Sequence, residues 1–502
     1  MENLSNLMMG FSIALTPENL LAALLGAFLG TIVGAMPGLG SSAGIAVLVP
    51  VSFNYDATTA LIMMCGVYYG SMYGGTITSV LVNLPGESAT VMTCLDGYQL
   101  AKKGQAGKAL GVSQIGSFIA GTTGVLALMM IAPPLAAFAL SFGPPEYFAL
   151  MVLGLTVLAS LGGGSMLKSL LMAVFGLLLS QVGTDPVGGA ARFTFDNVLF
   201  LNGIEFIPVA VGLFAIGELL ITAEKSMKLE FGRFSLRSMI PTASEWLRCA
   251  GAWVRGTLIG FVVGVLPGAG ATIASFIAYA TERRVSAHPD KFGTGVVEGV
   301  AAPEAANNAA SAGAMVPLLT LGVPGSGSTA VMLGALMIHG LRPGPLLFQQ
   351  NPEFVWGLIA SMYIGNIALL ILNMPLVPLF TSILRIPYPV LAPIIVIVSF
   401  IGVYSINNSV FDVWVMFFFG VLGYFFKKFE YPVAPVVLAL VLGDLLERSL
   451  RQSLAMSQND PTIFFTRPIS GVLLLVCLLS LTSPLIRSWW ERRQAGALAG
   501  RQ

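Results

Sequence analysis

Long apolar stretches dominate this chain, and its polar residues gather in the short segments between them. Runs such as 20–36, 116–132, 355–380 and 469–485 approach or exceed the roughly 20 apolar residues that a helix needs to cross a bilayer. A helix satisfies its own backbone in lipid, whereas the ten-residue alternation of a membrane β-barrel is missing here. The pattern predicts an all-α polytopic membrane protein with about 10–13 membrane segments.

Glycine and proline interrupt the apolar runs in a pattern that occurs twice. Residues 30–40 and 260–270 both read G-x-x-x-G-x-x-P-G-x-G, and a second Pro-Gly element follows each copy, at 84–90 and 323–329. Matching breaks in two halves of an apolar chain are typical of the substrate site of a secondary transporter. We therefore expect broken or re-entrant helices at these four places.

Composition and charge add an orientation to this picture. Hydrophobic residues make up 56% of the chain and charged residues 10%, against about 25% charged in soluble proteins. The first basic residue is Lys102, and later clusters include 225–248, 283–291 and 487–493. The positive-inside rule then predicts a periplasmic N-terminus and a cytoplasmic C-terminus. A net charge of +1 gives no reason to expect a nucleic-acid partner.

The charge bias reverses between corresponding loops of the two copies. Loop 54–58 has no basic residue and loop 281–292 has three, but then loop 97–110 has three and loop 337–353 has one. This reversal predicts an inverted repeat, whose halves cross the membrane in opposite senses.

Four regions follow from the repeat. We expect a first repeat with broken helices at 1–140, and connecting helices with a cytoplasmic linker at 141–245. A second repeat with broken helices follows at 246–350. Scaffold helices and a cytoplasmic C-terminus are expected at 351–502.

Small and hydroxyl-bearing residues follow each break, where a new half-helix begins. A helix N-terminus presents unpaired N–H groups and partial positive charge, so it can bind a carboxylate without Arg or Lys. We expect Ser41 and Ser42 to cap such a helix, and Gly30, Gly34, Gly260 and Gly264 to pack helices closely. A Pro-Gly loop at the water interface is the alternative for the second elements. The candidate substrate-binding residues are Gly38, Gly40, Ser41, Ser42, Asn83, Pro85, Gly86, Ser88, Thr90, Gly268, Gly270, Thr272, Pro324, Gly325, Ser326, Ser328 and Thr329.

A polar stripe lies in the otherwise small and apolar segment after 298. Glu304, Asn307, Asn308 and Ser311 fall on one helical face. An intramembrane carboxylate marks a functional site by default. Glu304 is therefore the ion-coupling candidate, and Asn307 and Asn308 join the substrate-binding candidates. The alternative is a Glu304 that is solvated at the cytoplasmic mouth.

The remaining chemistry is sparse. Backbone carbonyls freed at the breaks suit Na⁺, but no firm metal site is expected, and the coupling ion is Na⁺ or H⁺. The chain offers no nucleophile–base pair, so we expect no cofactor, no catalytic residue and no enzyme activity.

Three stretches carry a family resemblance: GAMPGLG at 34–40, YGSMYGGTITSVLVNLPG at 69–86, and the segment 303–325 from PEAANN to LGVPG. In these motifs and in length the chain resembles the large membrane subunit of the tripartite tricarboxylate transporter family. The resemblance implies a bacterial inner-membrane uptake system driven by Na⁺ or H⁺. A periplasmic solute-binding protein would deliver a citrate-like or other organic carboxylate, and a small membrane subunit would accompany this chain.

Analogy with other broken-helix transporters suggests an elevator-like movement of the repeats against the scaffold. A passive anion channel, or another carboxylate permease, is the alternative to this kind of transporter.

Overall fold

The structure is a computed structural model that describes residues 2–36, 39–161, 165–185, 188–224, 236–268, 270–383 and 388–482. Helix is nearly the only regular structure in this part of the chain. Its two short strands, β1 (Gly183–Thr184) and β2 (Ala191–Arg192), pair antiparallel. The prediction of an all-α polytopic membrane protein is confirmed, because six described helices are long and apolar enough to span a membrane.

The chain forms two compact units, Met1–Leu140 with Glu205–Val433 and Ser141–Ile204 with Ala434–Gln502. The first unit contains α1 (Glu2–Ala14), α2 (Pro17–Ala35), α3 (Gly40–Ser52), α4 (Ala57–Val82), η1 (Ser88–Thr90), α5 (Val91–Lys102), α6 (Ala106–Ala139), α9 (Phe206–Ala210), η3 (Val211–Ile216), α10 (Gly217–Ala223), η4 (Leu236–Met239), α11 (Ala243–Val265), α12 (Gly270–Val285), η5 (Pro289–Lys291), α13 (Glu298–Leu321), α14 (Gly327–Ile338), α15 (Leu347–Gln350), α16 (Pro352–Ile383), α17 (Tyr388–Asn407) and α18 (Val410–Lys428). The second unit contains α7 (Pro144–Leu161), α8 (Met166–Ser180), β1, β2, η2 (Val198–Phe200), α19 (Ala434–Met456), α20 (Ile463–Thr466) and the apolar helix Pro468–Thr482.

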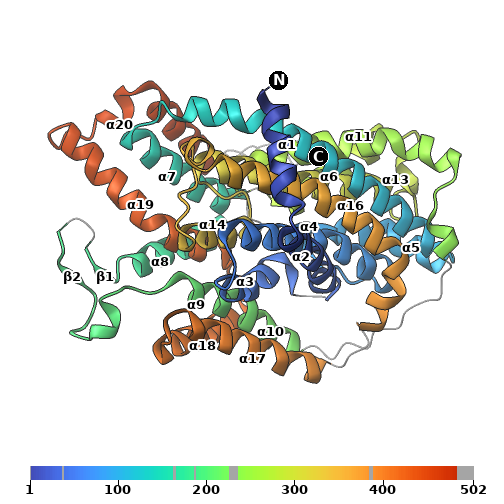
Figure 1. Cartoon of the computed structure of the whole chain (residues 1–502). Helices are drawn as coiled ribbons and strands as arrows, with labels where there is room; N and C mark the ends of the chain where they lie inside the picture. The colour runs from blue at the N-terminus through green and yellow to red at the C-terminus, as the bar shows by residue number, and fades with distance from the viewer. Residues whose placement is uncertain are drawn as a thin grey trace, which may run out of the picture. The chain divides into compact units, whose positions relative to one another are not determined.

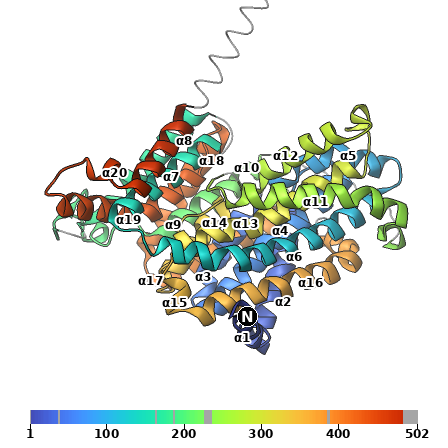
Figure 2. The same cartoon turned by 90° about the horizontal axis from the view of Figure 1, so that it is seen from above.

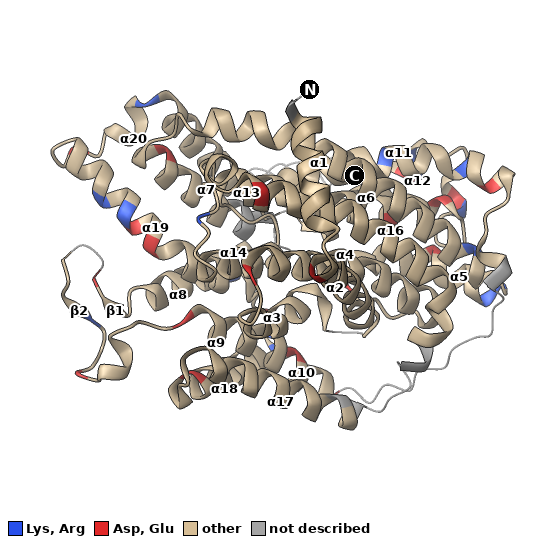
Figure 3. Ribbon diagram, viewed as in Figure 1, with Lys and Arg blue, Asp and Glu red and all other residues tan. Residues whose placement is uncertain are grey.

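The helices of spanning length are α2, α6, the continuous α9–η3–α10 segment, α11, α16 and α18. Shorter apolar helices include α3 and α14, which begin just after breaks in the sequence. Lys, Arg, Asp and Glu are sparse along the described helices (Figure 3). This distribution is the one that a lipid-facing surface requires, because charge inside a bilayer is costly.

Helices follow one another in the same order in the two halves of the first unit. In the first half, α2 ends at the Gly/Pro motif, α3 follows, α4 ends at the second Pro-Gly element, and η1 and α5 lead to α6. In the second half α11, α12, α13, α14 and α16 repeat this order (Figure 1). Helix α2 packs on α4 as α11 packs on α13, and α6 lies beside α13 (Figure 2). The opposite senses of the halves in the membrane, and the four expected regions, stay predictions.

The two long buried helices also end in the same way. Asn83, with φ of +59°, follows α4, and Gly322, with φ of +69°, follows α13. Both residues take the left-handed conformation that closes a helix C-terminus, which Gly adopts freely and Asn tolerates. The structure therefore gives Asn83, a binding candidate, a role in ending α4.

Close helix packing accounts for the leading glycines of each motif. A Cβ at Gly34 would lie 2.1 Å from the carbonyl oxygen of Ser71 on α4. One at Gly264 would lie 2.4 Å from the carbonyl oxygen of Ala310 on α13, and Gly30 and Gly260 meet backbone atoms similarly. The packing interpretation of these four glycines is confirmed.

Replacing Gly34 or Gly264 by alanine should lower the melting temperature of the purified protein. The added methyl group collides with backbone that cannot move aside, and overpacking of this kind costs about 1–3 kcal/mol. Gly365→Ala on α16 is the matched control, since its Cβ would lie 3.7 Å from the Tyr69 ring and alanine favours the helix by about 1 kcal/mol. Equal melting temperatures for all three variants would contradict the packing role.

Ion pairs organise the second unit around α19. Arg448 pairs with Asp444 at 3.0 Å and Arg451 with Glu447 at 2.6 Å, each four residues along the helix. Arg192 of β2 binds Glu447 at 2.9 Å. All three pairs therefore place an acidic residue of α19 beside an arginine.

Candidate substrate and ion site

Four helix beginnings meet inside the first unit. Ser41 and Ser42 in the first turn of α3 hydrogen-bond with Ser328 of α14, at 2.7 and 3.1 Å between hydroxyl oxygens. Ser88 of η1 hydrogen-bonds with Thr272 of α12 at 2.9 Å. We call these five residues the hydroxyl cluster. Each contact joins the first break of one half to the second break of the other.

Backbone contacts hold the two breaks of each half together. A Cβ at Gly86 would lie 1.8 Å from the carbonyl oxygen of Gly34, and one at Gly325 would lie 3.0 Å from that of Gly264. The Gly268 N–H, with φ of +79°, also donates to the Gly325 carbonyl at 3.1 Å. Gly86, Gly268 and Gly325, all binding candidates, thus position the cluster through close backbone approach.

Three further candidates bond within their own loops and to α4. The Thr90 hydroxyl is buried, donates to the Glu87 carbonyl at 2.8 Å and accepts from Ser79 at 2.8 Å. Ser326 and Thr329 cap α14 reciprocally, with Ser326 N–H donating to Thr329 Oγ1 at 2.8 Å. Ser326 also hydrogen-bonds with the Tyr68 hydroxyl at 3.1 Å. These side chains stabilise the loops that carry the cluster.

Ser41 and Ser42 do not cap α3, so that expectation is wrong. The N-cap position is Leu39, and its side chain makes no capping bond. Gly40 and Gly270 turn the chain into α3 and α12 with φ of +65° and +64°. The serine hydroxyls consequently lie inside the first turn and reach across to Ser328.

The proline candidates lie where the helices are interrupted. Pro85 is half-buried between α4 and η1, and Pro324 is buried between α13 and α14. Neither can donate a backbone hydrogen bond, so each fits a segment between helices. Gly38 lies outside the described residues.

Glu87 was missed as a site residue. Its Oε2 accepts a hydrogen bond from the Ser41 backbone N–H at 2.6 Å, at the N-terminus of α3. Its Oε1 accepts from the backbone N–H and the hydroxyl of Ser88, both at 3.2 Å. Glu87 is only 8% exposed. The sequence did contain a signal for this role. Glu87 is an acidic residue directly after a Pro-Gly break, whereas the second half has Ser326 at the corresponding position.

Glu304 lies at the centre of a second polar group. It is 0% exposed, and its carboxylate accepts hydrogen bonds from Thr76 at 2.6 Å, from the Thr93 hydroxyl, and from Asn307 at 3.3 Å. The Asn308 amide donates to Asn307 Oδ1 at 2.7 Å and to the Glu304 carbonyl at 3.1 Å. These donors are all neutral. The alternative of a solvated Glu304 is therefore wrong.

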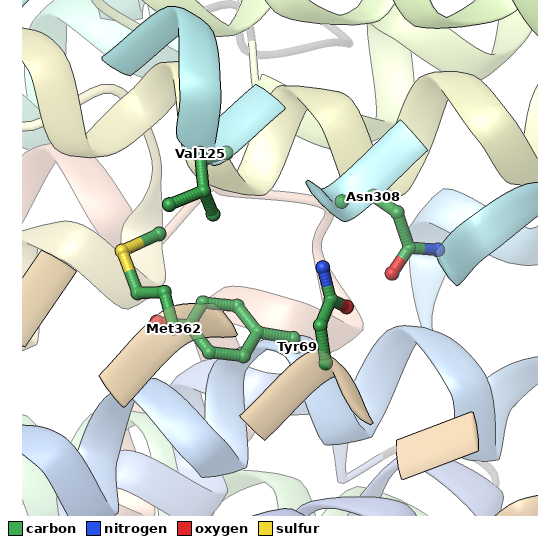
Figure 4. A pocket seen from close by; sticks show the side chains of 7 residues that line it. Tyr69, Val125, Asn308 and Met362 are labelled. Atoms are coloured by element: carbon green, nitrogen blue, oxygen red, sulfur yellow. The ribbon is translucent and has the colours of Figure 1, made fainter. Parts of the chain in front are cut away.

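A small cavity adjoins this group between α4, α6, α13 and α16. Tyr69, Val125, Asn308 and Met362 surround it (Figure 4), together with Gly121, Ala312 and Asn366. Its volume is about 10 Å³, near the roughly 10–15 Å³ that one water molecule requires. Neither Tyr69 Oη nor Asn308 Oδ1 has a hydrogen-bond partner among the described residues. The cavity thus suits one water molecule, and it is too small for an organic acid.

Two tyrosines of α4, Tyr68 and Tyr73, should respond differently to loss of the hydroxyl group. The Tyr73 hydroxyl is buried without a partner in the described part of the chain, so Tyr73→Phe should leave the melting temperature unchanged or raise it. Tyr68→Phe loses the bond to Ser326 and should destabilise the protein by about 1 kcal/mol. A larger loss for Tyr73→Phe would show that its hydroxyl has a partner in the folded protein.

Sequence similarity links this chain to a family of known proteins. The sequence model of the family described as "Tripartite tricarboxylate transporter TctA family" matches residues 20–438. An uncharacterised 52.8 kDa protein in the TAR-I ttuC' 3' region of Agrobacterium vitis is 46% identical over 491 residues, which cover 97% of this chain and 98% of that protein. An uncharacterised protein in the TAR-II ttuC' 3' region of the same organism is 47% identical over 232 residues, 46% of this chain and 96% of that protein. No solved structure matches the chain.

Proposed function

Because the chain belongs to the tripartite tricarboxylate transporter TctA family, we propose that it is the large membrane subunit of a secondary transporter that imports tricarboxylates or related organic acids. This is a family of transport proteins, and the described helices make the chain a multi-pass membrane protein. The observation that carries the proposal is the meeting of four helix beginnings at the hydroxyl cluster.

The hydroxyl cluster has the chemistry that several carboxylates require. A helix N-terminus presents N–H groups that have no partner within the helix, and a helix of several turns adds about half a positive charge. The serine and threonine hydroxyls add further donors. An anion with two or three carboxylates can use several helix beginnings at once. No Lys or Arg inside the membrane is needed for this mode of binding.

Membership of the family supports the proposed partners and location. A periplasmic solute-binding protein delivers the organic acid, and a small membrane subunit completes the complex. The protein lies in a bacterial inner membrane, with its N-terminus in the periplasm and its C-terminus in the cytoplasm. The absence of basic residues before Lys102 supports this orientation.

Glu304 is the proposed coupling residue. A charged carboxylate that is 0% exposed and has only neutral donors carries a large desolvation cost. A bound proton or Na⁺ removes that cost. The hydroxyl oxygens of Thr76 and Thr93 can turn toward a cation, and oxygen atoms are the ligands that hard cations prefer.

The substrate crosses the membrane by an elevator-like movement of the broken-helix repeats. The repeated helix order supports the proposal, together with analogy to other broken-helix transporters. Inward- and outward-facing structures with the broken helices unmoved relative to the scaffold helices would refute this movement.

The substrate class is tested by uptake into proteoliposomes that contain this chain, the small membrane subunit and the binding protein. Radiolabelled citrate, other tricarboxylates, dicarboxylates and a neutral sugar form the panel. We expect saturable uptake of one or more carboxylates and none of the sugar. Unsaturable flux of many anions would favour a passive anion channel.

A further inference from the structure

We infer that the Glu87 carboxylate occupies, in the substrate-free protein, the place that a carboxylate group of the substrate takes during transport. Glu87 then sets the substrate affinity as a built-in competitor. The inference rests on the proposed function. Its starting point is the 2.6 Å hydrogen bond from the Ser41 backbone N–H, in the first turn of α3, to Glu87 Oε2.

Glu87 is held in this place by both of its oxygens. Ser88 donates its backbone N–H and its hydroxyl to Oε1, each at 3.2 Å, while Oε2 receives the Ser41 N–H. With 8% of its surface exposed, Glu87 already satisfies the free N–H and partial charge at the start of α3 as a bound anion would. A second carboxylate cannot use the Ser41 N–H until Glu87 leaves it.

Donors for an incoming carboxylate are present at the same point. The Ser328 hydroxyl hydrogen-bonds with those of Ser41 and Ser42 at 2.7 and 3.1 Å, and each of the three can turn its hydrogen toward a carboxylate oxygen. Displacement of Glu87 therefore exposes one backbone N–H beside three hydroxyl groups. Such a set matches a carboxylate, which accepts up to about four hydrogen bonds.

Among the described residues of the second half, no carboxylate takes the corresponding place. The residue that corresponds to Glu87 is Ser326, whose hydroxyl bonds with Thr329 and Tyr68. A Cβ at Gly270, at the start of α12, would meet only Ser326 Cβ at 3.8 Å and the Gly325 carbonyl oxygen at 3.9 Å. The two matching helix beginnings thus differ by one buried carboxylate. Competition between a protein carboxylate and a substrate carboxylate is therefore expected at the start of α3 and not at the start of α12.

The size of the effect follows from the fraction of molecules in which Glu87 has left Ser41. Apparent affinity is the intrinsic affinity multiplied by that fraction, so a fraction of about 1–10% weakens binding about 10–100-fold. Removing the charge frees the site, because hydrogen bonds to a charged acceptor are roughly twice as strong as those to a neutral one.

The test measures citrate binding to the full-length chain in lipid nanodiscs by calorimetry. Glu87→Gln should bind citrate at least about tenfold more tightly than the wild type. Glu87→Asp keeps the charge on a shorter side chain, so its gain in affinity should be smaller than that of Glu87→Gln. Unchanged or weaker binding by Glu87→Gln would overturn the inference.

A second pair of variants tests the shared N–H without changing Glu87. Ser41→Pro removes this N–H at a helix position that tolerates proline, whereas Ser41→Ala keeps it. We expect Ser41→Pro to bind citrate more weakly than Ser41→Ala, and equal affinities would overturn the inference. If the wild type takes up citrate and Glu87→Gln binds no tighter, only the inference fails. If the wild type complex takes up no carboxylate of the panel, the proposed function fails with it.

Discussion

Glu304→Gln should abolish gradient-driven uptake while leaving the protein folded. Glutamine has the same shape, so its carbonyl oxygen can accept from Thr76 and its amide can donate to the Thr93 oxygen. The variant lacks the charge that holds a proton or Na⁺. Loss of a residue that only hydrogen-bonds to a metal ligand already weakens metal binding about 10–100-fold. Because Glu304 itself would hold the ion, we expect uptake to fall about 100-fold or more. Radiolabelled uptake at graded Na⁺ concentrations and pH values measures the effect.

Glu298→Gln is the matched control for this experiment. Glu298 lies six residues before Glu304 on α13, and it pairs with the exposed Arg248 at 2.9 Å. Exposed ion pairs contribute about 0–1 kcal/mol, so this variant should retain its cation dependence. If Glu304→Gln keeps the cation dependence of the wild type, the coupling ion binds at another group.

Leucine at Gly40 or Gly270 should abolish uptake without preventing membrane insertion. Both glycines have φ near +65°, which costs other residues about 1–2 kcal/mol. A Cβ at Gly40 has room at 3.5 Å from Glu87 Oε2, and one at Gly270 at 3.8 Å from Ser326. A leucine side chain extends beyond this space into the hydroxyl cluster. Uptake assays and membrane fractionation of the same preparations separate the two effects.

Gly104→Leu separates backbone strain from obstruction of the site. Gly104 has φ of +74°, and a Cβ there meets nothing within 4 Å. This variant carries similar strain away from the cluster and should transport at near the wild-type rate. Wild-type uptake by both Gly40→Leu and Gly270→Leu would exclude the hydroxyl cluster as the substrate site.

The positions of the breaks could be predicted from sequence because glycine and proline act locally. Helices α2 and α11 end at Ala35 and Val265, within two residues of Pro37 and Pro267, since proline disfavours helix in the residue before it. The all-α polytopic fold followed from apolar run length in the same way. Close helix packing at Gly34 and Gly264 could also be predicted from the sequence, because small residues four positions apart allow two helices to approach each other.

Contacts between distant segments could not be predicted in this way. Ser41 and Ser328 are 287 positions apart, and no local rule specifies that they meet. For this reason Ser41 was expected to cap its own helix, and the contact between Glu87 and the Ser41 N–H was missed. Whether Glu304 is buried or solvated could not be predicted either. The six residues from Glu298 to Glu304 span about 9 Å along a helix, which is enough to separate a solvated position from a buried one.

The central claim is that this chain belongs to a gradient-driven transporter that needs a binding protein. Uptake of radiolabelled citrate into proteoliposomes tests it most directly when each component and gradient is withheld in turn. The proteoliposomes contain this chain and the small membrane subunit, with or without the solute-binding protein. An inward Na⁺ gradient, an inward H⁺ gradient or no gradient is then imposed. We predict that citrate accumulates above its external concentration only with the binding protein and one of the gradients. Citrate flux that needs neither would contradict the account and identify a passive pathway.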